Sequence, residues 1–74
     1  MARAILAAVG GVDNIEEFDP CTTRLRALVR DPRLVDPAAL RAAGAHGTLR
    51  AGRVVQIVVG PQVDVIAEEL DELL

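Results

Sequence analysis

The sequence of 74 residues has few of the residue types that several classes of function require. It contains one cysteine, so no disulfide can form within the chain. One cysteine and one histidine are also too few for a Cys/His zinc site. Phe18 is the only aromatic residue, which excludes a platform of stacked rings for single-stranded nucleic acid. The net charge is only −3, so nothing indicates a general attraction to nucleic acid.

Long apolar runs are also missing. The apolar stretch from Ala4 to Val9 is far too short to span a membrane, and too short for a signal-peptide core with a cleavage site. Hydrophobic residues nevertheless make up 51% of the chain and charged residues 26%, a balance typical of a folded protein. We therefore expect residues 1–74 to form a single cytoplasmic domain, in which any membrane role comes through a partner.

The spacing of apolar residues predicts three helices. One covers residues 2–9, where apolar side chains recur at the i, i+3, i+4, i+7 positions. Asp36, followed by a proline, predicts the start of a second helix over residues 38–43, and Gly44 predicts its end. The third helix is expected over residues 63–73, with apolar residues on one side and acidic residues on the other.

Four strands are expected over residues 14–19, 23–30, 48–50 and 54–59. The short connections predict two antiparallel hairpins. Three amphipathic helices can cover only one face of a four-stranded sheet, which leaves the other face open to water. The predicted fold is therefore an α+β two-layer sandwich, with a four-stranded antiparallel sheet and three helices on one face.

Cys21 is the main candidate for chemistry. Most lone cysteines are small buried hydrophobic residues, and composition alone favours that interpretation. The neighbouring proline and threonines are unusual company for a core position, however, and the connection between the first two strands should be exposed. Arg24 and Arg26 follow on one face of the next strand, where guanidinium groups can stabilise a thiolate and bind a phosphoryl group. Taken alone, these arginines are equally well interpreted as ordinary solvated strand residues.

Residues 21–26, with the sequence CTTRLR, resemble the Cys-x-Thr-Arg-Leu-Arg signature of the enzyme IIB domain of the bacterial sugar phosphotransferase system. The resemblance spans nearly the whole chain and includes Gly10-Gly11, Asn14-Ile15, Val55-Gln56 and Gly60. Asp19 and the Ala45-x-Gly47 segment resemble the glucose/N-acetylglucosamine branch. Two positions differ from the family pattern: Pro20 replaces a small residue and Val54 replaces a glycine.

The resemblance implies a role for each matching residue. Cys21 matches the residue that becomes phosphocysteine, and Thr23, Arg24, Arg26 and Gln56 match residues around the phosphoryl group. Asp19 matches a loop residue that positions an arginine or the loop itself.

For the whole protein, the resemblance implies a phosphoryl carrier. Such a carrier accepts phosphate from a phosphohistidine on enzyme IIA and passes it to a sugar bound by the membrane enzyme IIC. No metal or organic cofactor is expected. The implied protein is a monomer, either a separate subunit or an excised domain, at the inner face of the cell membrane.

Alternatives remain at several positions. Gln56 shares a face with Val54 and Val58 by alternation, and it either lies near Arg24 and Arg26 or is exposed at a sheet edge. His46 lies in a glycine-flanked loop and is interpreted as a surface residue, not a general base. For the whole chain, the main rival is a non-catalytic regulatory module on the same scaffold. A thiol-redox protein is a weaker rival, because no second cysteine is present.

Overall fold

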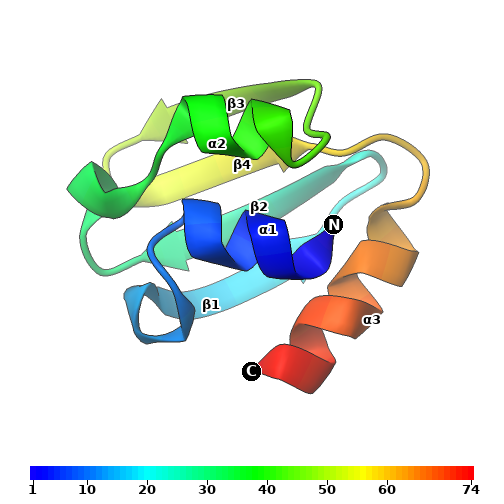
Figure 1. Ribbon diagram of the computed structural model, residues 1–74, viewed down its shortest axis with the longest axis horizontal. Coiled ribbons are helices and arrows are strands. Elements are labelled where there is room, and N and C mark those ends of the chain that lie inside the picture. The colour runs from blue at the N-terminus through cyan, green and yellow to red at the C-terminus, as the bar shows by residue number, and fades with distance from the viewer.

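The computed structural model describes all 74 residues, and Figure 1 shows the arrangement of its elements. The helices are α1 (Ala2–Ala8), α2 (Pro37–Ala42) and α3 (Val63–Leu73). The strands are β1 (Ile15–Pro20), β2 (Arg24–Val29), β3 (Gly47–Ala51) and β4 (Val54–Val58). Two one-turn 3-10 helices, Val12–Asn14 and Pro32–Leu34, precede β1 and α2. None of the three α-helices is long and apolar enough to cross a membrane.

The four strands form one antiparallel sheet in the order β1-β2-β4-β3. The two predicted hairpins, β1–β2 and β3–β4, therefore lie side by side through β2 and β4, which are the central strands. Figure 1 shows all three helices on the same side of this sheet, with α3 nearest β1. The predicted α+β two-layer sandwich is confirmed.

The hydrophobic core lies between the helices and the covered face of the sheet. It comprises 18 buried residues. In β2 the alternation is as expected, because Leu25, Ala27 and Val29 are buried whereas Arg24 and Arg26 are exposed. The apolar faces of the helices also pack against this core. Ile66 of α3, for example, is only 3% exposed.

A β-bulge explains why β1 has the weakest strand pattern in the sequence. Its two large apolar residues, Ile15 and Phe18, are three positions apart, which does not fit a simple alternation. The register shifts between Ile15 and Glu17, so that one extra residue of β1 lies opposite β2. Both Ile15 and Phe18 consequently pack against the core.

Asn14 is buried at one end of the sheet and was expected at the start of the first strand. The structure places it in the 3-10 helix instead, with its side chain 3% exposed. Its Nδ2 donates to the Val9 carbonyl at 2.6 Å and to the Asp31 carbonyl at 3.1 Å, and its Oδ1 accepts from the Asp31 N–H at 2.9 Å. One amide side chain thus joins the end of α1 to the segment after β2.

The glycine at position 10 makes this close approach possible. Gly10 has a φ of +105°, and a Cβ atom there would lie 2.8 Å from Asn14 Nδ2 and 2.8 Å from Leu34 Cβ. The predicted helix boundary is thereby explained, because α1 ends just before the chain takes this conformation. At α2 the predicted N-cap is also confirmed, since the Asp36 carboxylate accepts from the N–H groups of Ala38 and Ala39.

Candidate functional site

The loop between β1 and β2 carries the only cysteine. Cys21, Thr22 and Thr23 are all exposed, which confirms the expectation that Cys21 is accessible. The loop backbone is nevertheless well held. The Cys21 N–H donates to the Arg24 carbonyl at 2.7 Å, which closes the hairpin. The loop therefore presents its side chains to solvent from a backbone that is itself hydrogen-bonded.

A second anchor comes from the segment that follows β4. The N–H groups of Val59 and Gly60 both donate to the Thr23 carbonyl at 3.0 Å. Gly60 has a φ of +85°, a conformation that glycine adopts without strain. Gly60 entered the sequence-based prediction only as a position that resembles the family pattern. That resemblance is the one signal in the sequence for its role in anchoring the loop.

Arg24 and Arg26 lie on the open face of the sheet, immediately after the loop. They are exposed, and their partners across the strand pair are Val58 and Gln56 of β4. The two ion pairs of the structure join Arg33 to Asp31 and Arg53 to Glu16, so neither Arg24 nor Arg26 is paired with a carboxylate. Two uncompensated guanidinium groups therefore stand beside the cysteine loop, where they can bind an anion.

Gln56 lies next to these arginines, which was the first of the two alternatives predicted for it. Its Oε1 accepts a hydrogen bond of 3.0 Å from Arg24 Nη1. β4 is flanked by β2 on one side and β3 on the other, so the alternative expectation of exposure at a sheet edge is wrong. The structure thus brings together residues that are 32 positions apart in the sequence.

Asp19 lies on the same open face, directly across the strand pair from Arg26. The two residues line a small hollow of about 130 Å³ together with Glu17, Leu28 and Val54. Asp19 is exposed and takes part in neither ion pair. Its placement beside an arginine agrees with the expected position, and its role remains a prediction.

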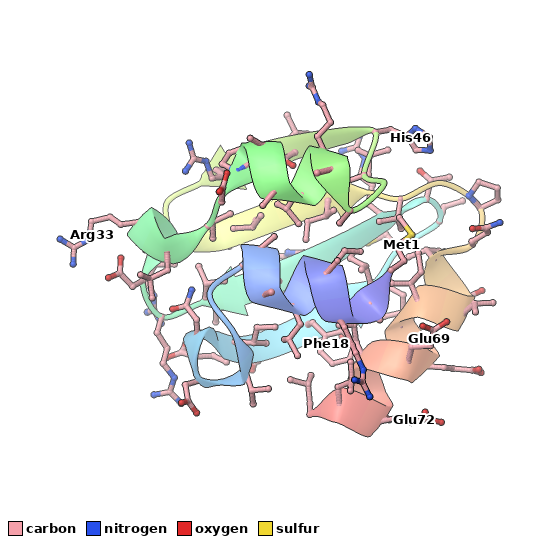
Figure 2. All side chains as sticks on the ribbon, in the orientation of Figure 1. Met1, Phe18, Arg33, His46, Glu69 and Glu72 are labelled. Carbon is pink, nitrogen blue, oxygen red and sulfur yellow. The ribbon has the colours of Figure 1, made fainter.

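His46 is a surface residue at the end of the sheet that carries the cysteine loop (Figures 1 and 2). Its backbone N–H donates to the Val58 carbonyl at 2.8 Å, and its ring passes close to Gly60. The side chain has no hydrogen-bond partner that would orient it as a base. The exposed loop and the open sheet face together form a surface that another protein can reach, with a thiol at its margin.

Comparison with known proteins identifies the family to which this arrangement belongs. Residues 3–36 match the family model described as phosphotransferase system, EIIB. The chain is 49% identical over 73 residues to the N-acetylglucosamine-specific EIIB component of the phosphotransferase system of Streptomyces coelicolor, covering 99% of this chain and 95% of that protein. The chain belongs to the EIIB family of the phosphotransferase system. Membership of this family implies phosphotransferase activity.

Two further comparisons extend this result. An alpha-glucoside-specific EIICB component of Leptotrichia buccalis is 45% identical over 71 residues, which cover 95% of this chain but only 13% of that protein. The EIIB region is thus a small part of that longer relative. A crystal structure of one domain of the IIabc component from Clostridium difficile superposes with a TM-score of 0.80 at 24% identity. The superposition covers 96% of this chain and 75% of the Clostridium difficile chain, and this likeness supports the fold.

Proposed function

We propose that this EIIB domain is a phosphoryl carrier in sugar uptake, with Cys21 as the residue that is phosphorylated. The observation that carries the proposal is the placement of an exposed Cys21 beside two arginines without carboxylate partners on the open sheet face. The implied donor is a phosphohistidine of enzyme IIA, and the implied acceptor is a hydroxyl of a sugar bound to membrane enzyme IIC.

The reaction consists of two displacements at phosphorus. In the first, the Cys21 thiolate forms an S–P bond while the P–N bond of the phosphohistidine breaks and its electron pair returns to the imidazole. In the second, a sugar hydroxyl oxygen bonds to phosphorus and loses its proton, while the S–P bond breaks and the thiolate is restored. Both steps need a site that positions the phosphoryl group and stabilises its charge.

The residues around Cys21 are suited to that task. Arg24 and Arg26 supply charge-assisted hydrogen bonds to phosphoryl oxygens, with Gln56 beside Arg24. Thr23 contributes a hydroxyl or backbone amide from the loop. Asp19, which lies across the strand pair from Arg26, positions an arginine or the loop itself. No residue of this set requires a metal or an organic cofactor in the proposed reaction.

The names of the relatives support the proposed EIIC partner and the proposed class of sugar. One relative is named for EIIC and EIIB together, which supports an association with EIIC, and through it a position at the cytoplasmic face of the membrane. The 49% identical relative is named for N-acetylglucosamine, so we propose a sugar of the glucose/N-acetylglucosamine class. A carrier that must release each partner is expected to act as a monomer in short-lived complexes.

The test is the intact mass of the protein after incubation with phosphoenolpyruvate, enzyme I, HPr and a glucose-class IIA. One added phosphoryl group is expected on the parental chain and none on Cys21→Ser, whose hydroxyl is a far weaker nucleophile than a thiolate. Labelling of Cys21→Ser at the parental rate would remove Cys21 from the mechanism. A parental chain that takes up no label would favour the non-catalytic regulatory module.

A further inference from the structure

Gln56 is the one polar side chain on the open face of β4. Its neighbours on that face are Val54 and Val58, and all three residues are half-buried. A strand interior between two valines is an unfavourable place for an amide unless the amide has a partner. The only side-chain partner of Gln56 is Arg24, whose Nη1 donates to Gln56 Oε1 at 3.0 Å.

The direction of this hydrogen bond fixes how the amide is oriented. A guanidinium group can only donate hydrogen bonds, so the carbonyl oxygen of Gln56 must face Arg24 and its NH₂ group must point away. Arg24 has no carboxylate partner, and as a long exposed side chain it would otherwise sample many rotamers. The bond to Gln56 therefore restricts Arg24 at the strand position next to the cysteine loop.

The chemical nature of the acceptor matters as much as its position. A carboxylate would hold Arg24 more firmly, but it would also cancel part of the charge that an incoming phosphoryl group needs. A neutral amide holds the guanidinium and leaves its charge uncompensated. Arg26 differs in this respect, because it lies directly opposite Gln56 in the register yet makes no hydrogen bond to it.

We propose that Gln56 is a positioning residue that holds Arg24 beside Cys21 before the phosphoryl group arrives. This inference rests on the proposed function, since it concerns the same transfer. In this proposal Gln56 acts through Arg24, and its amide need not contact the phosphoryl group. Substitutions of Gln56 and Arg24 should therefore not have independent effects on the rate of transfer.

The central variant is Gln56→Met, which keeps the length and the packing between the valines but removes the acceptor. Phosphorylation of Cys21 by IIA should slow about 10-fold, because an unrestrained Arg24 must be ordered during transfer. Gln62→Met is the matched control, since it makes the same substitution at an exposed glutamine whose side chain forms no hydrogen bond, and it should transfer at close to the parental rate. Melting of each variant is measured alongside.

Two further variants separate positioning from direct action. Combining Gln56→Met with Arg24→Ala should be no slower than Arg24→Ala alone, because the role of Gln56 disappears with Arg24. Gln56→Glu retains an acceptor but adds a negative charge, so it should be slowed at least as much as Gln56→Met. In nuclear magnetic resonance spectra, the Arg24 guanidinium signals should show restricted rotation in the parental chain and averaging in Gln56→Met.

Each outcome decides a distinct point. Parental transfer rates in a folded Gln56→Met would overturn the positioning role while leaving Cys21 as the carrier. Multiplied effects in the double variant would also overturn it, since Gln56 would then act independently of Arg24. If the parental chain takes no phosphoryl group on Cys21, the proposed function fails and this inference fails with it.

Discussion

The two faces of the sheet are built from alternate residues of the same strands, yet they differ in every property that bears on function. On the covered face, Leu25, Val29 and Ile57 are at most 1% exposed and belong to the hydrophobic core. On the open face, Arg24 and Arg26 stand in solvent next to the cysteine loop. The covered face contributes stability, and the open face holds the groups proposed for catalysis.

This separation has a physical basis. An unpaired charge cannot be buried without a large desolvation cost, so groups that must meet a phosphoryl group have to lie where water can reach them. The backbone of the strand still positions them, because the covered side chains of the same strand are fixed in the core. Changes to one face should therefore affect stability and changes to the other should affect rate.

The largest effect is expected from the covered side. Ile66→Ala should lower the free energy of unfolding by ~2–5 kcal/mol, because Ile66 is 3% exposed and its loss leaves a cavity under α3. Val65→Ala is the matched control, since Val65 is adjacent in the same helix but 57% exposed. Thermal and urea melts measure both. Equal melting of the two variants would mean that the apolar stripe of α3 does not hold the core.

The buried polar residue Asn14 tests whether stability and transfer rate can be changed separately. Asn14→Ala should destabilise the fold by about 1–3 kcal/mol through the buried Val9 carbonyl that loses its partner, and by a smaller amount through the part-buried Asp31 N–H. Chemical denaturation measures this loss. Among the molecules that remain folded, the rate of Cys21 phosphorylation should stay at the parental value. A slower rate at unchanged stability would connect this end of the sheet to the chemistry.

The open face should respond in the opposite way. Arg24→Ala and Arg26→Ala should melt like the parental chain but slow at least one of the two transfers ~10- to 100-fold, through the loss of a charge-assisted hydrogen bond. Lysine at either position should restore only part of the rate, because it keeps the charge but loses the forked geometry. Phosphorylation by IIA and transfer through IIC-containing membranes are timed separately. Parental rates in both steps would favour the regulatory alternative.

The smallest effect is expected at the exposed pair Asp31–Arg33, which lies away from both faces. Side-chain and then backbone hydrogen bonds from Arg33 lower the pKa of Asp31 below its ordinary value of 3.8. A carboxyl group whose pKa is lowered in the folded state contributes stability at pH values above its ordinary pKa. The contribution is lost as the pH falls through the lowered pKa.

Melting temperatures of the parental chain and Asp31→Asn at several pH values test this effect. The two proteins should differ slightly at neutral pH and converge in acid. A difference between the parental chain and Asp31→Asn that does not change with pH would exclude a contribution from the titration of Asp31.

Elements with a regular pattern were predicted correctly from the sequence. The alternation in β2, the N-cap at Asp36 and the stripe of α3 are short-range signals, and each element lies within one or two residues of the expected range. β1 was the least regular, because its bulge breaks the alternation. The exposure of Cys21 was predicted from its neighbours in the loop, and its role was inferred from the CTTRLR resemblance.

The sequence alone determined which residues could carry chemistry and which face of the regular elements, such as β2 and α3, would be buried, because both depend on residue type and on spacings of two to four positions. Only the tertiary structure decided which of them meet. The bond between Gln56 and Arg24, and the anchoring of Thr23 by Gly60, depend on how β2 and β4 align across a gap of about thirty residues. Strand register is set by the joint packing of all core side chains, and no local segment contains that information.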